Sequence, residues 1–403
     1  MRIFFSVGEP SGDLHGANLI RALKSRHPAW EFVGYGGPKM ADAGCRLHFD
    51  LTQLAVMWLG EALANYSKFR RLVAQADAYF QKHRPDAIVL VDYPGFNWHI
   101  AKKAKAQGIP VIYYGTPQLW AWASWRVAKM RRYVDHVLCK LPFEEKWFRE
   151  RGCQATFVGH PYFDELEAQH LNAQFIERLG TDKRPLVTIL PGSRTQEVKS
   201  NLLPFLKAAK LIRKQVPNVR FAVAAFKESQ RLLAQQIIED SGVYAELYVA
   251  KTPELIHAAK CCLACSGSVS LELLYHTKPT AILYQISHLA HFAQRFLRKV
   301  RYITLVNLLT AKEPFVEGQA GHYDPADPRD AHVLMPEYLT CEDRTADLAG
   351  HIVEWLQSDA ALQKNVQGLA ELKARIGQGG ASLRAAGYIE ALFADSVAKP
   401  QAA

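Results

Sequence analysis

The sequence has no long uninterrupted apolar run, and this absence limits how the chain can meet a membrane. Nowhere do about 18 or more apolar residues follow one another without a charge, the length that a membrane-spanning helix needs. Residues Met1–Val7 also lack the basic, apolar and small-residue order of a signal peptide. We therefore expect no export and no transmembrane helix, so that any membrane contact is peripheral.

Cysteine is scarce and irregularly spaced. The 403 residues include seven cysteines, an odd number that argues against a secreted disulfide framework and favours a reducing compartment. Cys261, Cys262 and Cys265 lie close together, but no second pair stands at the spacing of a zinc site. We expect these three to be buried apolar side chains, and we expect neither a metal site nor a cofactor.

Several common catalytic motifs are also missing. The strings GxxxxGK[ST], HExxH and GxSxG do not occur, which excludes the simplest P-loop NTPase, zinc metalloprotease and α/β-hydrolase interpretations. The glycine-containing segment GEPSGD, Gly8–Asp13, is not GxGxxG, which weakens a dinucleotide-binding interpretation.

The composition is that of a folded chain with more than one core. Hydrophobic residues make up 49% and charged residues 22%, which excludes a compositionally disordered protein. The length predicts two domains of roughly 150 to 200 residues. The net charge of +10 indicates an anionic partner, and nucleic acid, an acidic membrane face and phosphorylated substrates all fit it.

Short apolar runs alternate with helical patterns in both halves, which predicts two doubly wound α/β domains with parallel sheets. The predicted strands of the first half are Ile3–Val7, Phe32–Tyr35, Ala87–Val91, Val111–Tyr114, Val134–Cys139 and Thr156–Val158. Those of the second half are Leu186–Leu190, Val219–Ala225, Leu247–Ala250, Cys261–Cys265 and Ala281–Tyr284.

Two polar stretches separate these regions. Asp164–Arg184 predicts one short helix followed by a linker, and we place the hinge there. Ala311–Met335 is rich in Gly, Pro, Asp and His without periodicity, which predicts a loop or insertion. After it, the pattern is helical to the end of the chain, with a frayed tail from Val397.

Two turns in the first half follow predicted strands. Ligands of open α/β sheets bind beyond the carboxyl ends of the strands, which makes Ser11 and Gly12 of GEPSGD candidate contacts. A helix cap by Ser11 or Asp13 explains the segment equally well. Asp92 follows the strand Ala87–Val91, and an acid at that position can take a proton from an attacking hydroxyl. The alternative is an Asp that caps a helix starting near Asn97.

In the second half, the segment LPGSR, Leu190–Arg194, forms a strand-to-helix turn. Ser193 and Gln196 have the spacing of a capping box. Arg194 would oppose the dipole of the following helix, a placement that is explained if a phosphate binds between them. An arginine that points into solvent remains the alternative.

A second such turn is SGSVSLE, Ser266–Glu272. Its small residues Gly267 and Ser268 leave room for a nucleotide, and Glu272 could accept ribose hydroxyls. An acid that merely favours a helix start is the alternative for Glu272.

Three clusters mix basic and aromatic residues: Lys68–Arg71, Trp120–Arg132 and His291–Tyr302. Such mixtures suit a lipid headgroup interface or single-stranded nucleic acid. Tryptophan is more often a core residue than either.

Taken together, six segments closely resemble the lipid-A-disaccharide synthase family. They run in order from Gly8 to about Leu309 and comprise GEPSGD, VDYPGFN (Val91–Asn97), TPQLWAW (Thr116–Trp122), FVGHP (Phe157–Pro161), LPGSRTQEV (Leu190–Val198) and SGSVSLE.

The resemblance implies the GT-B glycosyltransferase fold, in which two Rossmann-like domains have the active site in the cleft between them. It implies an acceptor- and membrane-binding domain over residues 1–165 and a UDP-sugar-binding domain over 185–340. The remaining residues 341–403 would be helices that pack across both domains.

The resemblance also implies the reaction. Transfer of 2,3-diacylglucosamine from UDP-2,3-diacylglucosamine to 2,3-diacylglucosamine 1-phosphate would give a β(1→6) disaccharide for lipid A and release UDP. It further implies a homodimer on the cytoplasmic face of the inner membrane of a Gram-negative-type cell, with an anionic membrane surface and no nucleic acid among its partners. A UDP-sugar 2-epimerase of the same fold and a nucleic-acid-binding protein are the alternatives.

The family motifs carry roles to individual residues. Asp92 matches the family's proposed base and Arg194 its contact to the UDP phosphate. Glu197, Glu272 and Asn307 match further UDP-site positions, the last within the short segment VNLL. Ser193, Gly267, Ser268, Ser11 and Gly12 complete the predicted substrate-binding set.

Two features depart from the family pattern, namely His15, where a small or aliphatic residue is more usual, and the insertion Ala311–Met335. The apolar segment Leu54–Leu63 is the predicted contact for the acyl chains, with basic side chains nearby for the 1-phosphate and anionic headgroups.

Overall fold

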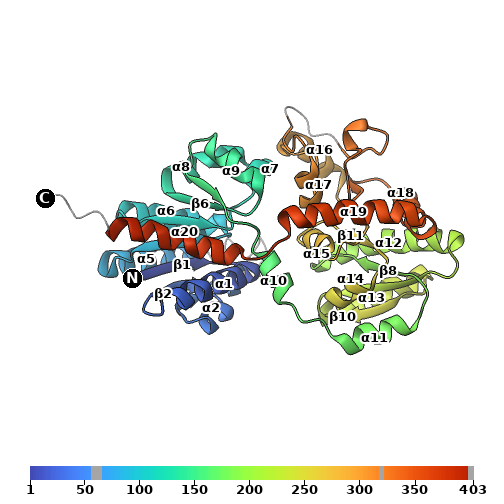
Figure 1. The fold of residues 1–403 in the computed structure, drawn as a ribbon, viewed down its shortest axis with the longest axis horizontal. Helices are drawn as coiled ribbons and strands as arrows, with labels where there is room; N and C mark the ends of the chain where they lie inside the picture. Colours follow the sequence, from blue (N-terminus) through green and yellow to red (C-terminus); the bar gives the residue numbers. More distant parts are fainter. Residues whose placement is uncertain (56–65, 317–321, 398–403) are drawn as a thin grey trace. The chain divides into compact units, whose positions relative to one another are not determined.

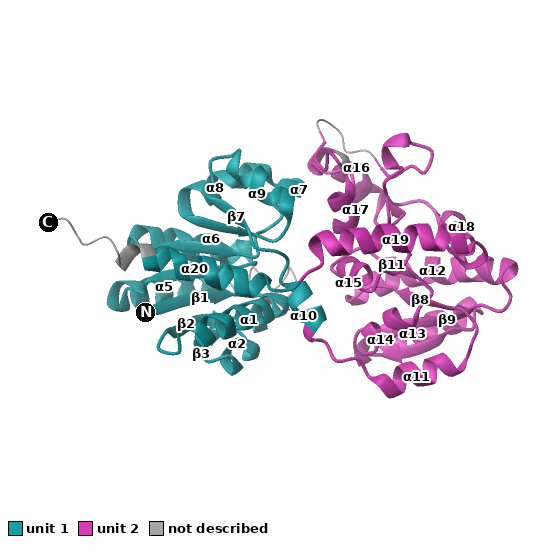
Figure 2. Ribbon diagram, viewed as in Figure 1, with its two compact units in different colours: residues 1–167, 379–403 teal, residues 168–378 magenta. Residues whose placement is uncertain are grey.

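The computed structural model describes residues 1–55, 66–316 and 322–397. The chain divides into two compact units (Figure 1), the first made of residues 1–167 and 379–403 and the second of residues 168–378 (Figure 2). The predicted acyl-chain contact at Leu54–Leu63, with Met57 and Trp58, lies almost wholly outside the described residues.

Unit 1 contains a seven-stranded parallel sheet in the order β3-β2-β1-β4-β5-β6-β7. The order reverses between β1 and β4, so the carboxyl ends of these two strands flank the point where ligands bind in such sheets. The strands are β1 (Arg2–Val7), β2 (Glu31–Gly36), β3 (Cys45–Asp50), β4 (Ala87–Val91), β5 (Val111–Tyr114), β6 (His136–Cys139) and β7 (Ala155–Phe157).

The edge strand β3 is absent from the sequence prediction. Its residues run Cys-Arg-Leu-His-Phe-Asp, and only Cys45 is buried. The central strands β1, β4 and β5 are instead buried along almost their whole length, which produces the continuous apolar runs by which a strand is recognised.

The helices of unit 1 connect these strands and cover the sheet. They are α1 (Pro10–Arg26), α2 (Pro38–Asp42), α3 (Thr52–Ala55), α5 (Tyr66–His83), α6 (Pro94–Ala106), α7 (Leu119–Trp122), η1 (Ser124–Arg126), α8 (Val127–Tyr133), α9 (Pro142–Arg149), α10 (Tyr162–Ala168) and α20 (Ala381–Val397). The red helix α20 in Figure 1 thus comes from the far end of the sequence.

The helix α20 packs against α1. Glu390 forms ion pairs with Arg26 (2.8 Å) and His27 (3.0 Å), and the hydroxyl of Tyr388 lies 3.1 Å from Nδ1 of His136. The C-terminal segment 341–403 therefore divides between the two units, because α18 (Thr345–Gln357) and α19 (Asp359–Ile376) belong to unit 2.

Unit 2 contains a six-stranded parallel sheet in the order β10-β9-β8-β11-β12-β13. Its strands are β8 (Leu186–Leu190), β9 (Arg220–Ala225), β10 (Glu246–Val249), β11 (Cys261–Cys265), β12 (Thr280–Gln285) and β13 (Glu337–Thr340). The prediction that the chain is helical after Met335 is wrong, because the short strand β13 pairs with β12 before α18 begins.

The helices of unit 2 lie between these strands. In addition to α18 and α19 they are α11 (Ala173–Thr181), α12 (Thr195–Gln215), α13 (Glu228–Ser241), α14 (Thr252–Ala258), α15 (Val269–Tyr275), α16 (His288–Leu297), α17 (Leu305–Thr310) and η2 (Pro328–Asp330).

The stretch Asp164–Arg184 contains most of α10 and all of α11, rather than a single helix. Asn172 caps α11 by accepting a hydrogen bond from the amide of Phe175 (2.9 Å), and Phe175 and Leu179 are buried one turn apart. The division between the units falls after Glu167, one residue before the end of α10.

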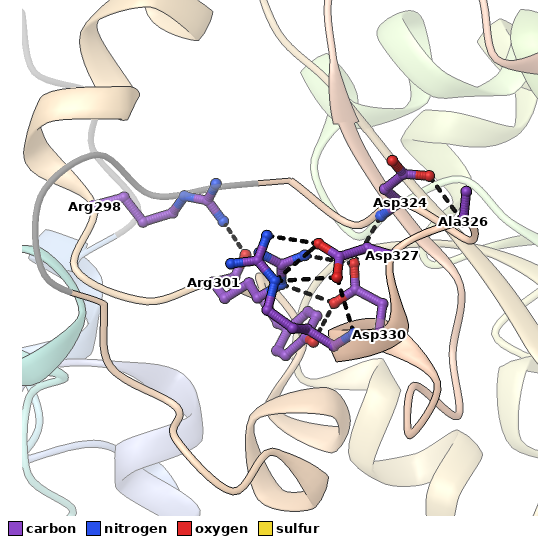
Figure 3. Close-up of polar contacts among 8 residues, drawn as sticks. Arg298, Arg301, Asp324, Ala326, Asp327 and Asp330 are labelled. Carbon is purple, nitrogen blue, oxygen red and sulfur yellow. Dashed lines mark hydrogen bonds and ion pairs between the residues drawn. The ribbon is translucent and has the colours of Figure 1, made fainter.

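The predicted insertion Ala311–Met335 is tied to the body of unit 2 through Arg301 (Figure 3). The guanidinium of Arg301 donates to Asp330 (2.7 and 2.8 Å) and Asp327 (2.9 Å), while the amide of Asp324 donates to Asp330 (2.8 Å). The hydrogen bond with Asp330 and the negative charge of that residue, together with Tyr302, raise the pKa of Arg301. Residues 317–321 of the insertion lie outside the described residues.

Two expectations from composition concern membrane-spanning helices and the state of the cysteines. Across the described residues, no helix combines the length and the apolar content required to cross a membrane. All seven cysteines are free, and Cys261, Cys262 and Cys265 are buried in β11, as predicted. Burial raises the pKa of the Cys262 thiol to about 12.

Candidate active site

Asp92 lies directly after β4, beside the point where the strand order of unit 1 reverses. It adopts a left-handed backbone conformation (φ 43°), as does Tyr93 (φ 45°), which costs a residue other than glycine about 1–2 kcal/mol. The carbonyl of Asp92 accepts hydrogen bonds from Asn97 Nδ2 (2.8 Å) and from the Tyr113 hydroxyl (2.6 Å). These two bonds hold the strained turn in place.

Asn97 bonds this turn to β1. It is fully buried, its Oδ1 accepts from the hydroxyl of Ser6 (2.7 Å), and its Nδ2 also donates to the carbonyl of Ser6 (3.1 Å). Helix α6 begins at Pro94 with Tyr93 as its N-cap, and no side chain caps it. The alternative that Asp92 caps a helix is therefore excluded, and its carboxylate is left for another role.

The carboxylate of Asp92 is paired with Lys140. Lys140 Nζ lies 3.3 Å from Asp92 Oδ1, and the two side chains are only 12% and 20% exposed. Burial by itself lowers the pKa of Lys140, but the negative charges of Asp92, Glu144 and Glu9 outweigh burial and raise it. Lys140 directly follows β6, so the strand-end criterion that selected Asp92 would have selected Lys140 as well.

Glu144 holds the backbone at Lys140 through hydrogen bonds. It is fully buried and accepts hydrogen bonds from Trp120 Nε1 (2.9 Å) and from the amides of Lys140 (2.8 Å) and Leu141 (3.0 Å). Burial raises the pKa of Glu144, against the opposing effect of the Lys140 charge. Glu144 thus fixes the backbone from which the Lys140 side chain reaches Asp92.

The GEPSGD segment approaches this turn closely. A Cβ atom on Gly8 would lie 2.2–2.6 Å from the ring of Tyr93, so only glycine fits there. Gly12 is buried with Val7 and Val91 nearby, and Ser11 is exposed in the first turn of α1.

Asp13 has a different role from either one considered for this segment. Its carboxylate accepts from the amides of Gly37 (2.8 Å), Lys39 (3.0 Å) and Met40 (3.1 Å), so it caps α2 and not its own helix. Helix α1 begins at Pro10 with Glu9 as its N-cap and without a side-chain cap, so neither Ser11 nor Asp13 caps it.

Two histidines lie near this half of the site. His15, the departure from the family pattern, is buried with Nδ1 2.9 Å from Glu165 Oε1 and thereby links α1 to α10. His160 accepts a hydrogen bond from the amide of Tyr162 through Nδ1 (3.2 Å). Desolvation, together with the charges of Lys140 and His15, holds the pKa of His160 well below its ordinary value.

In unit 2, Arg194 is the N-cap residue of α12. Glu197 Oε2 accepts from the Arg194 amide (3.0 Å), and Glu197 Oε1 accepts from the Arg194 guanidinium (2.9 Å). The predicted capping box of Ser193 and Gln196 is therefore wrong by one residue, since Glu197 takes the N3 role. Arg194 remains 73% exposed, so its guanidinium can meet a ligand at the amino end of the helix.

Three buried side chains that the sequence analysis did not single out hold the loops of this half. Asn201 Nδ2 donates to the carbonyl of Glu197 (2.9 Å), and its Oδ1 accepts from the amide of Gln285 (3.1 Å). Gln230 Nε2 donates to the carbonyl of Ser193 (2.7 Å). The third, Glu337, accepts hydrogen bonds from Thr304 and Asn307. A polar residue inside an otherwise apolar helical face is the sequence feature that could have identified Asn201.

The turn after β11 is open. Gly267 and Ser268 are exposed, and a Cβ on Gly267 would meet nothing within 4 Å. Glu272 lies buried in α15, the helix that follows this turn, and Ser266 Oγ donates to the carbonyl of Ile303 (3.3 Å).

Asn307 is enclosed within unit 2. Its Nδ2 donates to the carbonyl of Met335 (2.7 Å) and to Glu337 (2.9 Å), and its Oδ1 accepts from the Met335 amide (3.1 Å). Glu337 also accepts from the amide and hydroxyl of Thr304 (3.0 and 2.6 Å). The side chain of Asn307 thus positions the loop at the end of the insertion.

The predicted residues therefore fall into two groups. Ser11, Gly12 and Asp92 belong to unit 1, and Ser193, Arg194, Glu197, Gly267, Ser268, Glu272 and Asn307 belong to unit 2. Apart from Asn307, they lie in the turns and helix starts that follow the central strands of each sheet. Within the described parts of both units, no three His, Cys, Asp or Glu side chains are grouped so that they could hold a metal ion.

A sequence model of the family described as lipid-A-disaccharide synthetase matches residues 3–358. This chain belongs to the lipid-A-disaccharide synthase family. It is 34% identical to the lipid-A-disaccharide synthase of Myxococcus xanthus over 386 residues, which cover 96% of each chain. It is 36% identical to that of Coxiella burnetii over 325 residues, 78% of this chain and 83% of the relative.

Solved structures show the same architecture at low sequence identity. The UDP-GlcNAc 2-epimerase of Neisseria meningitidis, solved with UDP-GlcNAc bound, superposes with a TM-score of 0.59 at 12% identity and covers 98% of this chain and 100% of its own. MurG of Acinetobacter baumannii superposes with a TM-score of 0.56 at 11% identity, over 96% and 99% of the two chains. The fold is GT-B, as predicted.

Family membership decides among the functions left open by the sequence. The chain is a glycosyltransferase, and the findings favour neither the epimerase nor the nucleic-acid-binding alternative. The likeness to the epimerase extends to the fold alone, because the identity is only 12%.

Proposed function

We propose that this protein transfers 2,3-diacylglucosamine from UDP-2,3-diacylglucosamine to 2,3-diacylglucosamine 1-phosphate, with inversion, giving the β(1→6) disaccharide 1-phosphate and UDP. The observation that carries the proposal is the carboxylate of Asp92, which stands at the strand-order reversal of unit 1 beside Lys140 and caps no helix. Membership of the family supports the identity of both substrates.

Asp92 is the base in this mechanism. Its carboxylate removes the proton of the acceptor's primary hydroxyl while that oxygen forms a bond to the anomeric carbon of the donor. The bond from the anomeric carbon to the UDP oxygen breaks at the same time, with positive charge developing on the sugar as in glycoside hydrolysis. Lys140 holds the carboxylate in position through their ion pair.

Unit 2 holds the leaving group. The negative charge that grows on the diphosphate is balanced by Arg194 and by the exposed amides at the amino end of α12. Glu197 orients Arg194 through two hydrogen bonds. Ser193, Gly267 and Ser268 line the approach, and Glu272 accepts hydrogen bonds from the ribose.

Three further predicted residues take supporting positions. Asn307 shapes the rim through its bonds to Met335 and Glu337 instead of contacting UDP. In unit 1, Ser11 and Gly12 lie in the first turn of α1, the helix that follows β1, and would face the acceptor.

The protein would work as a peripheral protein on the cytoplasmic face of the inner membrane. Of the basic and aromatic cluster Trp120–Arg132, Trp120 is buried, whereas Trp122 and Trp125 are 49% and 64% exposed. Arg126 stacks 5.0 Å from the Trp122 ring, so cation and aromatic surface are presented together to anionic headgroups. A homodimer completes the proposal, and sedimentation of the purified protein would test it.

The decisive experiment supplies both lipid substrates to the purified protein. Mass detection of the disaccharide 1-phosphate, together with UDP release that requires the acceptor, would support the proposed reaction. UDP release or sugar epimerisation without the acceptor would contradict it. Cosedimentation with vesicles that contain anionic lipid, compared between the unaltered protein and Trp125→Ser, tests the membrane contact separately.

A further inference from the structure

A groove with a cavity volume of about 830 Å³ runs between α5 and α6 in unit 1. One face of α5 and one side of α6, as far as Lys103, line it together with the Tyr93 turn. The lining residues are Phe69, Arg70, Val73, Ala74, Asp77, Ala78, Gln81, Tyr93, Gly95, Phe96, His99 and Lys103. Its volume lies in the range of sites that take small organic ligands.

The groove is continuous with the proposed catalytic turn. Tyr93 follows Asp92 directly, and the rings of Phe69, Tyr93 and Phe96 form one cluster with centroid separations of 5.7–6.4 Å. A Cβ atom added to Gly95 would meet no neighbouring atom within 4 Å, so the groove is open beside this cluster. A ligand whose reacting group reaches Asp92 can therefore extend along the groove.

The groove is apolar along its length and cationic at its rim. Between the aromatic cluster and Gln81 the α5 face presents Val73, Ala74 and Ala78, over a helix length of about 18 Å. The single acid, Asp77, is neutralised by Lys103 at 2.7 Å. Arg70 is exposed at the aromatic end and forms no ion pair among the described residues.

We propose that this groove binds one acyl chain of the acceptor lipid, with the phosphate of the same molecule near Arg70. The inference rests on the proposed function, because the acceptor of that reaction combines a reacting hydroxyl, acyl chains and a phosphate. An alkyl chain fits the small apolar residues of α5, and a phosphate fits the uncompensated guanidinium. A purely apolar ligand would leave Arg70 without a role.

The test uses alkyl phosphates of increasing chain length, from butyl through octyl to dodecyl phosphate, below their micelle concentrations. Calorimetric titration of the full-length protein should show affinity that rises by at least about tenfold from octyl to dodecyl phosphate. The reason is that each methylene group buried in the groove adds to the binding free energy. Ala78→Trp fills the groove and should abolish this dependence on chain length. Gln75→Trp, on the same helix but outside the groove, should retain it.

A second variant tests the phosphate contact. Arg70→Gln should weaken binding of every alkyl phosphate several-fold while the increase with chain length persists. Dodecanol that binds as tightly as dodecyl phosphate would overturn the assignment of the phosphate. Circular dichroism and thermal unfolding of each variant show that a lost affinity does not come from a lost fold.

Turnover separates this proposal from the proposed function. With the diacylated acceptor, Ala78→Trp should raise the acceptor KM at least about tenfold and leave the donor KM unchanged. If the unaltered protein forms disaccharide and Ala78→Trp keeps both the acceptor KM and the chain-length dependence, the groove proposal is wrong and the function stands. If the unaltered protein forms no disaccharide, the function is wrong, whereas the alkyl phosphate titrations still decide what the groove binds.

Discussion

Lys140 Nζ lies 3.3 Å from Asp92 Oδ1, although the two residues are 48 positions apart in the chain. Each directly follows a strand of the same parallel sheet, and the ends of such strands meet at one edge. The pair joins the proposed base to a cation whose backbone amide is bonded to the buried Glu144. Substitutions at this pair test the proposed role of Asp92 as the base and of Lys140 as its partner.

Replacement of Asp92 by asparagine should lower kcat by about 10²–10⁴, the contribution expected of a general base. The side chain keeps its size and the backbone bonds of the turn do not involve the carboxylate, so UDP affinity should not change. Steady-state kinetics and UDP titration measure the two effects. Full turnover in Asp92→Asn would remove Asp92 from the mechanism.

Lys140→Met should destabilise the protein by about 2–4 kcal/mol at neutral pH, because it leaves Glu144 and Asp92 without their cation. The fold raises the pKa of Lys140, so its stabilisation is complete below the ordinary value of about 10.4 and is lost as the pH rises further. The penalty should therefore shrink as the pH rises above that ordinary value. Urea unfolding at several pH values measures it.

Lys140→Arg provides the matched comparison, since it keeps the charge and should recover most of the stability. A Lys140→Met protein as stable as the unaltered one would show that the buried carboxylates do not need this cation.

His160 should make the protein less stable in mild acid. Its folded pKa is held well below the ordinary value of about 6.5, so on lowering the pH the unfolded chain binds a proton that the folded chain does not. Stability should fall below about pH 6.5 by up to about 1.4 kcal/mol per pH unit from this residue. His160→Gln should reduce the dependence of the free energy of unfolding on pH in this range. Urea unfolding between neutral and mildly acidic pH measures it, and an unchanged pH dependence in the variant would contradict the role of His160.

Arg194→Ala should weaken UDP binding by about 10- to 100-fold, the loss expected for a charge-assisted hydrogen bond. The thermal midpoint should hardly move, because the exposed pair with Glu197 contributes little to stability. Arg231→Ala is the matched control, since Arg231 forms an equivalent pair with Glu228 three residues away in the same unit. Equal UDP affinity in Arg194→Ala and the control would refute the phosphate contact.

Gly8→Ala should destabilise the protein by about 1–3 kcal/mol and reduce activity, because the added methyl group would overlap the Tyr93 ring beside Asp92. Gly95→Ala, in the first turn of α6, meets no atom within 4 Å and should change stability by about 1 kcal/mol or less, in the stabilising direction. Denaturant unfolding compares the two. A Gly8→Ala protein as stable as Gly95→Ala would show that the Tyr93 ring moves freely.

The sequence predicted the central strands of both sheets because they are buried on both faces and therefore read as continuous apolar runs. It did not predict β3, in which only Cys45 is buried, or β13, which is only four residues long. The position of Asp92 and the Arg194 turn could be predicted for a related reason, since a strand end followed by a helix is a local feature of the chain.

The partners of these residues were beyond local reasoning. Asp13 looked like a cap of its own helix and Asn307 like a UDP contact, yet Asp13 holds α2 across 24 positions and Asn307 bonds to Met335 across 28. A polar side chain at a turn can bind a ligand, cap its own helix or bond to a distant segment, and the residue types are the same in each case.

By itself the sequence determined the family, the order of strands and helices in the two central βαβ regions, and the turns that carry Asp92 and Arg194. Tertiary structure alone decided that Lys140 faces Asp92, that α20 returns to unit 1, and that an open groove lies beside the Tyr93 turn. The physical reason is that strands and turns follow from neighbouring residues, whereas ion pairs, helix docking and cavities depend on which distant segments the folded sheet brings together.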